Sequence, residues 1–563
     1  MMSQVPLMIL NKNTKRDQGP RVQLGNIQAA KVIADIVRTC LGPKAMMKML
    51  LDPTSGIIIT NDGNAILREV QVQHPAAKSM IETSRTQDDE VGDGTTSVVI
   101  LAGELLTVLI PFIEQNIHPI ILIRSYTQAC TDVVNFLMSD KVCTPVNLSN
   151  NDEIIAVIKS SLDTKILHEW GTFACSIALE AVQTIEHKEG NRHEIDIKRY
   201  ARIEKIPGGS VSSSYVVKGV MLNKDVLHDQ MRRHIVNPRV LLLDCSLDFK
   251  KGESQTMMEF RNERDFTRAL EIEEEAIKDM CDAIREVKAD IVVTEKGVSD
   301  IAIHHLMTYG ISIIRRVRKT DNDRLARATG ATIVGDVYQL KSSDVGTQCG
   351  LFEVRKIQKE QYAFFEQCTN PKACTIVLRG SSKDLVDEIA RNLQDALCVA
   401  RNILLDPYIV PGGGACEIEL CKLLEDRARE AVDPIFSGVE KFPYLAAARA
   451  LEVIPRVLIK NAGANVIRTL TSLKSKHRSK AEGAKNFGID GETGMIIDTL
   501  EAGIVEPRLV KLQLFKSAIE MAITILRIDD IVSGSKKGST LDEKKDKEQR
   551  ENVEKDSKEG AEA

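Results

Sequence analysis

The chain contains 563 residues, carries a formal net charge of −5, and has 28% charged but only 4% aromatic residues. Single hydrophobic cores rarely grow beyond about 250–300 residues, so this length predicts several domains. The negative net charge argues against a nucleic-acid-binding protein, because such proteins usually present a basic face.

The apolar segments favour a protein that is neither exported nor inserted in a membrane. Residues 5–10 are too few for a signal sequence and are followed by Asn-Lys-Asn. The longest apolar run, residues 98–113, contains Glu104 and Pro111, and we expect it to fall short of a bilayer span.

The twelve cysteines include no Cys-x-x-Cys pair, so no cysteine metal site is predicted. Reduced thiols are expected for a cytosolic protein. Cys368 and Cys374 have five residues between them, and a disulfide between them is an alternative that the sequence leaves open.

The first third of the chain is predicted to be helical. Apolar residues recur at helical spacing from Ile27 to Leu41, and Gly42-Pro43 ends this helix. The β-branched residues 57–59 then predict a strand that ends in a tight turn at residues 60–63, Thr-Asn-Asp-Gly.

Residues 93–97, Asp-Gly-Thr-Thr-Ser, directly precede the apolar run 98–109. A helix that begins here presents unpaired N–H groups and a partial positive charge, which favour phosphate. Gly94 permits close backbone approach. Asp93 would repel a phosphate unless Mg²⁺ bridges the two. The alternative is a plain cap, in which Asp93, Thr95 or Thr96 accepts from backbone amides.

The predicted secondary structure changes in the middle of the chain. Residues 151–220 look mixed, with a helix over 170–184 and a turn at 207–209. Four short β runs follow, at 240–244, 291–294, 311–314 and 331–334, and helical segments at 298–309 and 322–328 alternate with them. Strands that alternate with helices predict an α/β layer.

Residues 248–268 interrupt this layer with charged and polar residues and lead into a charged helix over 269–287. A loop of this length in a compact domain is usually functional or disordered. Residues 374–378 predict a strand that leads back, and a helix capped by Ser381 or Ser382 follows to about residue 404. Its apolar stripe comprises Leu385, Ile389, Leu393 and Leu397. Asp395 lies off this stripe, so the sequence alone indicates a solvated carboxylate.

A triple glycine at 412–414 follows Val410-Pro411 and could lie flat against a ligand. If it and residue 93 touch one nucleotide, the two chain ends build one domain and the middle is an insertion. The last thirty residues, from Gly534, alternate Lys and Glu and predict a disordered tail.

These motifs occur together in the group II chaperonins, and the chain resembles that family from about residue 23 to about residue 534. The resemblance is carried by residues 41–44, 60–63, 92–97, 411–414 and 526–531. Residues 46–53 and 71–78 resemble one subunit type of the eukaryotic cytosolic chaperonin in particular. Ala45 departs from the pattern, because many relatives carry glycine after Gly-Pro-Lys; we expect contact through Gly42 to survive.

The resemblance implies a multidomain α and α/β fold. Residues 1–150 and 405–533 would form a helical equatorial domain, and residues 151–219 and 372–404 an α/β intermediate domain. Residues 220–371 would form an α/β apical domain with a helical lid protrusion at about 248–275, and residues 534–563 the tail. Segments 5–10, 56–60 and 526–532 are expected to be strands that pair within and between subunits.

The resemblance also implies a site for ATP and Mg²⁺. Asp93 would hold Mg²⁺, and Asp62 and Asp395 would flank the terminal phosphate and activate water. Asp395 would reach the nucleotide when the intermediate domain closes. The remaining nucleotide-binding residues would be Gly42, Gly94, Thr95, Thr96, Ser97, Thr164, Lys165, Gly413, Gly491, Glu492, Glu506 and Lys511.

The implied activity is ATP hydrolysis coupled to protein folding in the cytoplasm. The chain would be one subunit of a hetero-oligomeric double ring of paralogous chaperonin subunits, with actin and tubulin as clients and with no nucleic acid or membrane partner. The competing reading is a chaperonin-like scaffold that no longer hydrolyses ATP. Such relatives lose motif acids, whereas this chain keeps Asp62, Asp93 and Asp395. An unrelated ATP-dependent transferase would need further acid–base residues, and the sequence offers none beyond the nucleotide motifs.

Overall fold

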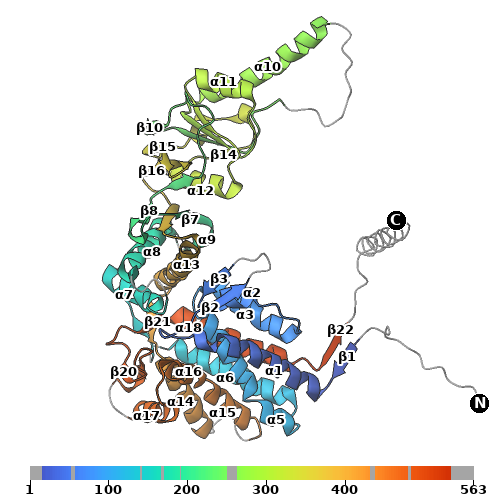
Figure 1. Ribbon diagram of the computed structural model, residues 1–563, viewed down its shortest axis with the longest axis vertical. Coiled ribbons are helices and arrows are strands. Elements are labelled where there is room, and N and C mark those ends of the chain that lie inside the picture. Colours follow the sequence, from blue (N-terminus) through green and yellow to red (C-terminus); the bar gives the residue numbers. More distant parts are fainter. Residues whose placement is uncertain are drawn as a thin grey trace, which may run out of the picture.

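The computed structural model describes residues 15–51, 57–139, 142–165, 170–190, 192–249, 263–430, 438–479 and 483–533. The molecule is elongated, with three large clusters of buried apolar residues one above the other along its long axis (Figure 1). The lower cluster draws on residues 27–143 and 410–526, and the upper cluster on residues 220–373. The middle cluster lies between them in space and draws on residues 146–211, 374–404 and Val505.

The lower part is a helical bundle built from both ends of the chain. At its centre, α4 (Thr95–Thr107) is flanked by α1 (Pro20–Val37) and α18 (Arg508–Leu526), and α18 also packs on α6 (Pro119–Leu137). The other helices are α2 (Gly63–Glu69), α3 (Pro75–Glu90), α5 (Ile110–Glu114), α14 (Ala415–Glu430), α15 (Lys441–Ala450), α16 (Val453–Ala462) and α17 (Val466–Arg478).

The apolar run that follows residue 94 is longer than the run 98–113 that was expected to fall short of a bilayer span. Thr95–Glu114 spans 20 residues with a mean hydropathy of 2.1, so by length and composition it could cross a membrane. Here it supplies the core helix α4 and the short α5, and 61% of its most apolar window is buried. The core helices of soluble proteins often have this length and hydropathy, so these two properties are only weak evidence that the run crosses a membrane.

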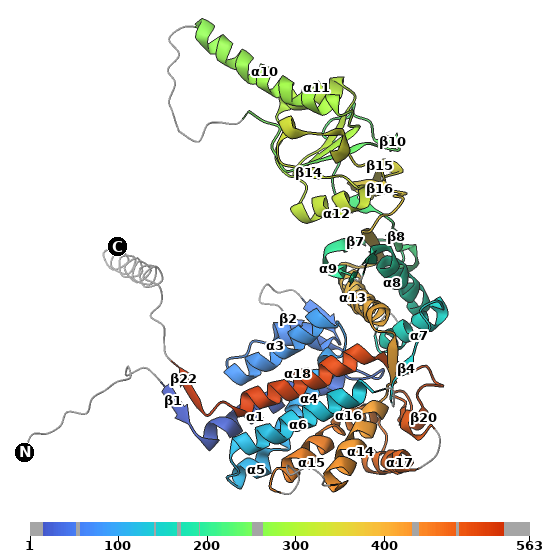
Figure 2. The ribbon, with the colours of Figure 1, turned by 180° about the vertical axis from the view of Figure 1, so that it is seen from behind.

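Small sheets border the helical bundle. β1 (Lys15–Gln18) pairs antiparallel with β22 (Asp530–Ser533), so the two ends of the described chain lie side by side (Figure 2). β2 (Lys48–Leu51) pairs with β3 (Ile57–Thr60) in a hairpin. The remaining pairings join β18 (Tyr408–Pro411) to β21 (Val505–Pro507) and β4 (Thr144–Pro145), and β19 (Phe487–Ile489) to β20 (Ile496–Asp498).

Two of the strand predictions need correction or fall outside the structure. Helix α18 runs to Leu526, so the C-terminal strand begins only at Asp530 rather than at residue 526. The predicted strand at 5–10 and the predicted tail at 534–563 lie outside the described residues.

The middle region packs α7 (Asn151–Leu162), α8 (Gly171–Ile185) and α13 (Lys383–Leu405) beside a three-stranded sheet, with the short α9 (Ile197–Tyr200) nearby. In that sheet β17 (Cys374–Gly380) lies between β7 (Ala201–Pro207) and β8 (Tyr215–Val217). A small hairpin of β5 (His187–Glu189) and β6 (Arg192–Glu194) adjoins it in sequence. Ser382 caps α13 by accepting from Leu385 N, which confirms one of the two predicted caps.

The upper region contains the predicted α/β layer. Its parallel sheet has the order β13 (Ser312–Ile314), β12 (Ile291–Thr294), β11 (Val240–Leu243), β14 (Ile333–Val334). Its helices are α10 (Glu263–Glu286), α11 (Asp300–Thr308) and α12 (Lys319–Thr329). Helix α10 begins six residues earlier than predicted and projects beyond the sheet (Figure 1). Residues 250–262 of the predicted protrusion lie outside the described residues.

The upper region also contains a second, antiparallel sheet that was not predicted from the sequence. Its order is β10 (His234–Val236), β15 (Leu351–Ile357), β16 (Glu360–Glu366), β9 (Val220–Leu222). Strands β15 and β16 are joined by only two residues, and Gln358 in that turn has a φ of 58°. Two β-rich runs separated by two residues are a hairpin signal that could have been recognised.

All twelve cysteines are free thiols, so the alternative of a Cys368–Cys374 disulfide is not found. The two thiols belong to different cores. Cys374 donates to the carbonyl of Ala181 at 3.7 Å in the middle region, whereas Cys368 is part of the upper cluster.

Candidate functional site

A cavity of about 470 Å³ lies where the helical bundle meets the middle region, and its lining comes from both. All fifteen residues that the sequence analysis assigned to the site line this cavity: Gly42, Asp62, Asp93, Gly94, Thr95, Thr96, Ser97, Thr164, Lys165, Asp395, Gly413, Gly491, Glu492, Glu506 and Lys511. These residues are spread over about 470 positions of the chain, so only the fold brings them together.

The N-terminus of α4 opens into the cavity. Its N-cap residue is Gly94, in a left-handed conformation with φ 77°, and no side chain caps the helix. The alternative in which Asp93, Thr95 or Thr96 serves as an ordinary cap is therefore wrong. Asp93 Oδ1 instead accepts from the adjacent Gly94 N at 2.7 Å. The first turn of α4 keeps backbone N–H groups that an anion can accept from.

Asp62 is fixed at the start of a second helix. Its carboxylate accepts from Asn64 N at 3.2 Å and Ala65 N at 3.1 Å, so it caps α2; the tight turn predicted here is a helix start. Thr95 Oγ1 also donates to Asp62 Oδ1 at 3.2 Å. This bond ties the start of α2 to the start of α4, so the carboxylate is held at the mouth of the phosphate-favouring helix.

Asp395 lies inside the cavity, not on a solvated face as the sequence alone indicated. Its side chain is 14% exposed and forms an ion pair with Lys165, whose side chain is 12% exposed. Burial raises the pKa of Asp395 well above its usual value, and the neighbouring acids Asp62 and Asp93 act in the same direction. Burial opposes the charge on Lys165, but the carboxylates of Asp395, Asp93 and Asp62 together raise its pKa, so it stays protonated.

Three carboxylates therefore converge on a single lysine, which leaves an excess of negative charge in a partly enclosed cavity. Oxygen ligands of this kind suit Mg²⁺, which usually binds one or two carboxylates together with phosphate oxygens. The carboxylate of Asp93, beside a helix N-terminus and with Asp62 and Asp395 nearby, fits a magnesium–phosphate group.

Glycines form the tight walls of the cavity. Gly413 has a φ of 61°, and a Cβ there would lie 2.6 Å from the carbonyl oxygen of Ile489. A Cβ on Gly491 would lie 2.3 Å from Cδ of Pro43. A side chain at either position would collide with the opposite wall, so the wall requires glycine.

Lys511 lines the cavity but its ammonium is held within the wall. It is 2.7 Å from Glu417 and 2.9 Å from Glu506, and the side chains of Lys511 and Glu417 are 2% and 0% exposed. Burial opposes its charge, yet the two carboxylates raise the pKa of Lys511. Burial raises the pKa of Glu506, which Lys511 opposes. The arrangement makes Lys511 a fixed support for Glu506.

Several lining residues were not predicted. Asn61 donates to the carbonyl of Thr164 at 3.2 Å, which joins the turn before α2 to the turn after α7. Ser160 accepts from Val505 N at 3.1 Å. Asp490 adjoins the predicted Gly491 and could have been included on that ground. The apolar lining residues, such as Ile454 and Leu458, carry no signal in the sequence that separates them from core residues.

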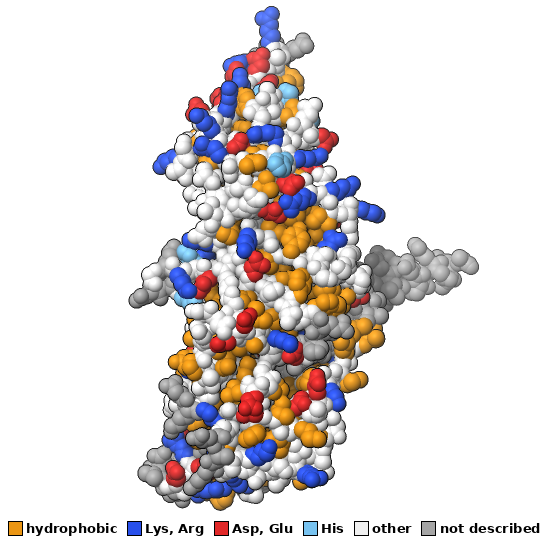
Figure 3. All heavy atoms as spheres, turned by 90° about the vertical axis from the view of Figure 1, so that its left-hand side faces the viewer, with side chains coloured by type: hydrophobic (Ala, Val, Ile, Leu, Met, Phe, Trp, Pro, Cys, Tyr) orange, Lys and Arg blue, Asp and Glu red, His pale blue; other side chains and the backbone are white. Residues whose placement is uncertain are grey.

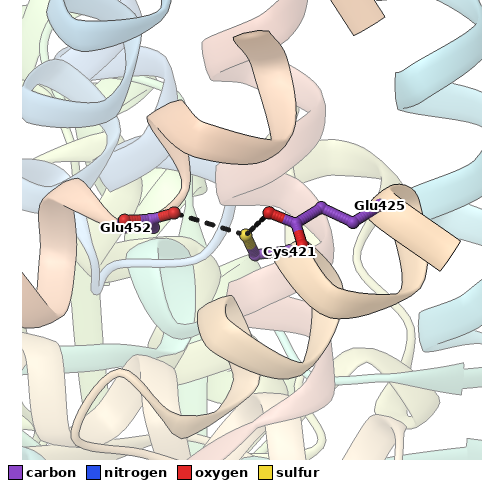
Figure 4. Close-up of side chains that lie close together, drawn as sticks. All are labelled: Cys421, Glu425 and Glu452. Atoms are coloured by element: carbon purple, nitrogen blue, oxygen red, sulfur yellow. Dashed lines mark hydrogen bonds between the residues drawn. The ribbon is translucent and has the colours of Figure 1, made fainter. Parts of the chain in front are cut away.

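A second acidic group lies away from the cavity. Cys421, Glu425 and Glu452 point toward one another, close enough to share an ion (Figure 4). Their carboxylates already have cationic partners, since Arg478 lies 2.5 Å from Glu425 and Lys474 pairs with Glu452. Burial raises the pKa of the Cys421 thiol, so it donates as a neutral group to Glu452 at 3.6 Å. This group is an ion-pair network and not a metal centre.

Comparison with known proteins agrees with the motifs. The family model for the TCP-1/cpn60 chaperonin family matches residues 33–536. The chain is 57% identical over 537 residues to T-complex protein 1 subunit gamma of Rattus norvegicus, covering 95% of this chain and 97% of the relative. The human subunit gamma is 56% identical over the same shares, and that of Schizosaccharomyces pombe is 53% identical over 95% of this chain and 100% of the relative. These matches confirm the resemblance, the chaperonin fold class and the subunit type indicated by residues 46–53 and 71–78: the chain belongs to the TCP-1/cpn60 chaperonin family.

Proposed function

We propose that this chain is an ATP-hydrolysing chaperonin subunit that works in the cytoplasm within a hetero-oligomeric double ring of paralogous subunits. One observation carries the proposal. A single cavity brings together a helix N-terminus, three aspartates and a lysine from segments far apart in the sequence. Phosphoryl transfer requires little beyond positioned phosphates, neutralised charge and an oriented water.

In this proposal the first turn of α4, with Gly94, Thr95, Thr96 and Ser97, binds phosphate oxygens of ATP. Asp93 holds Mg²⁺, which when bound neutralises charge on the phosphates. Asp62 and Asp395 orient the attacking water, and one of them accepts its proton. Lys165, now paired with Asp395, neutralises charge near the terminal phosphate. Gly42, Gly413, Gly491, Glu492 and Glu506 would line the side that receives the base and sugar.

We further propose the domain division expected from the family: an equatorial domain (1–150, 405–533), an intermediate domain (151–219, 372–404) and an apical domain (220–371) with a lid protrusion. The three separate buried clusters support it, because their residue ranges follow the same nested order. Unfolded proteins such as actin and tubulin would be the clients.

Contacts with paralogous subunits are proposed at the sheet edges of the bundle. Among the described strands, the hairpin of β2 and β3 pairs with no third strand, so its edges are open there. Met46, Met49 and Leu51, on or beside it, are 66–76% exposed. Exposed apolar residues next to an open strand edge favour a protein partner. Figure 3 shows a separate feature, the charge pattern of one face of the molecule, on which acidic and basic side chains are interspersed.

The proposal is tested in rings in which this subunit carries the change, with a photoreactive azido-ATP that labels each subunit separately. Asp93→Ala is expected to lose Mg²⁺-dependent labelling of this subunit, whereas Asp395→Ala keeps it. Rings in which the other subunits cannot hydrolyse ATP isolate the turnover of this one. Full labelling with no hydrolysis by the unmodified subunit would support the inactive-scaffold alternative instead.

A further inference from the structure

Two buried side chains of α3 contact the backbone at the start of α4. Gln87, which is 0% exposed, donates from Nε2 to the carbonyl oxygen of Asp93 at 3.0 Å. One turn earlier on α3, Ser84 is equally buried and donates from Oγ to the carbonyl oxygen of Thr95 at 3.4 Å. Both carbonyl groups therefore point toward α3, and α3 holds the beginning of α4 by its backbone.

The bond from Gln87 fixes the peptide group between Asp93 and Gly94. A peptide group is planar and trans, so the N–H of Gly94 points away from the carbonyl oxygen of Asp93. Because that oxygen is bound to α3, the N–H is directed away from α3. The Asp93 carboxylate accepts from this N–H at 2.7 Å. The place of the carboxylate thus depends on a peptide group whose orientation Gln87 sets.

The glycine at position 94 makes this peptide group easy to turn. Gly94 has a φ of 77°, and a residue without a Cβ reaches other backbone angles at little steric cost. The amide of Gln87 packs close to it, since a Cβ on Gly94 would lie 3.4 Å from Gln87 Nε2. A bond from another element is therefore needed to keep the peptide group in one orientation, and Gln87 supplies it.

Packing alone does not account for an amide at position 87. Among the described residues, the side chain of Gln87 makes no hydrogen bond except the one to Asp93, and its Oε1 has no partner. A buried acceptor without a partner costs free energy, and an apolar side chain of similar length would avoid that cost. The contact with Asp93 is what the amide provides and an apolar side chain would not.

We infer that Gln87 is a positioning residue for the turn at Asp93 and Gly94, both of which line the cavity. It holds their shared peptide group so that the carboxylate and the N–H are presented on the cavity side rather than toward α3. Without this donor the peptide group is free to rotate, and fewer molecules present both groups at once. The consequence for Mg²⁺ rests on the proposed function, in which Asp93 holds the ion, whereas the bond to the turn does not.

Hydrogen exchange in nucleotide-free assembled rings tests the bond itself. Gln87→Met keeps the length of the side chain and removes the donor. The Gly94 amide should then exchange about two- to tenfold faster, the factor expected for one lost hydrogen bond. The amides of Val91 and Gly92 donate to the backbone carbonyl of Gln87 at 3.0 and 3.2 Å, and the substitution leaves that carbonyl in place. Their exchange should therefore not change.

Two outcomes of the exchange measurement overturn the inference. The first is an unchanged rate at Gly94. The second is an equal increase at Val91, Gly92 and Gly94, because this would show that Gln87 merely keeps the end of α3 folded.

A magnesium titration tests the consequence for the ion. Azido-ATP labelling of this subunit in assembled rings is measured against Mg²⁺ concentration. In Gln87→Met the half-saturating Mg²⁺ concentration should rise about two- to tenfold, again the factor for one hydrogen bond. Labelling in excess chelator should equal that of the unmodified subunit, since a role confined to Asp93 leaves metal-free binding alone. Gln23→Met makes the same change at a buried glutamine of α1, 8% exposed, and should titrate as the unmodified subunit does.

The two measurements separate this inference from the proposed function. A half-saturating Mg²⁺ concentration that is the same in Gln87→Met and in the unmodified subunit overturns the inference. If labelling of the unmodified subunit does not depend on Mg²⁺ at all, while Gly94 alone exchanges faster in Gln87→Met, the proposed role of Asp93 fails and the positioning of the turn by Gln87 stands.

Discussion

Two lysines line the same cavity, but they are held in different ways. Lys511 lies between Glu417 and Glu506 inside the helical bundle, and its side chain is only 2% exposed. Lys165 is paired with Asp395 across two separate segments, 230 positions apart in the chain, and both side chains keep some exposure. A buried triad of this kind fixes a wall, whereas a partly open pair with further acids nearby can exchange partners when a charged ligand enters.

The largest effect is expected at the open pair. Asp395→Asn removes a proton acceptor while keeping the size of the side chain, and general-base catalysis contributes about 10²–10⁴-fold to a rate. We expect single-turnover ATP hydrolysis by this subunit to slow by about that factor, with azido-ATP labelling unchanged. An unchanged hydrolysis rate would remove Asp395 from the proposed reaction.

The same carboxylate predicts a pH dependence that the triad does not. Burial raises the pKa of Asp395, so its charged form is lost at a higher pH than that of an ordinary aspartate. Hydrolysis should therefore fall about tenfold per pH unit on acidification below that pKa. The residual hydrolysis rate of Asp395→Asn should not fall on acidification. A fall of that rate in the variant would show that another group titrates.

At the closed triad the expected effect is on stability. Lys511→Met leaves Glu417 buried without a counter-charge, and loss of one partner of a buried ion pair costs about 3–5 kcal/mol. Hydrogen exchange of α18 in assembled rings should report this loss. The double change Lys511→Met with Glu417→Gln should recover part of it, and no recovery would show that the charges are not coupled.

A smaller effect is expected at the glycine wall beside the triad. Gly413→Ala places a side chain at a φ of 61° and 2.6 Å from the carbonyl of Ile489, a strain of about 1–3 kcal/mol. Azido-ATP labelling should weaken while Lys511 and its partners stay protected from exchange. Gly310→Ala is a matched control, because Gly310 also has a positive φ, 74°, and a Cβ there meets nothing within 4 Å.

The smallest effect is expected at the start of α13, the helix that carries Asp395. Ser382→Ala removes a cap at Leu385 N, which costs about 1 kcal/mol. Exchange at the first turn of α13 should increase, and that of α18 should not. Equal changes in both helices would mean that the two lysine sites are not independent.

The sequence predicted the parts of the site that depend on local chemistry. Residues 93–97 carry the helix start, and the triple glycine carries the close approach, because both are set by neighbours in the chain. Asp395 shows the limit, since its spacing on α13 indicates a solvated residue and only the packing of α13 on the bundle encloses it. Without the resemblance it would have been missed.

The fold, like the site, could be predicted from the sequence only where local sequence determines the structure. Long amphipathic helices and the alternating strands of the parallel sheet were predictable from their periodicity. The antiparallel sheet of β9, β10, β15 and β16 was missed, because its strands are short or carry charges and its order joins residues about 140 positions apart. The contrast between Cys368 and Cys374 is similar, since closeness in the chain did not place their thiols in one core.

The place of α18 has a consequence for how the protein is made. This helix packs against α4 and α6, and ten of its residues are buried. The helices that the first part of the chain contributes to the same bundle, α1 to α6, end at Leu137. A ribosome delivers α1 to α6 first and α18 only after nearly 400 further residues. Until then the apolar flanks of α4 and α6 lack their cover, so the nascent chain exposes them throughout most of its synthesis. The protein is therefore expected to need protection by another chaperone until translation ends.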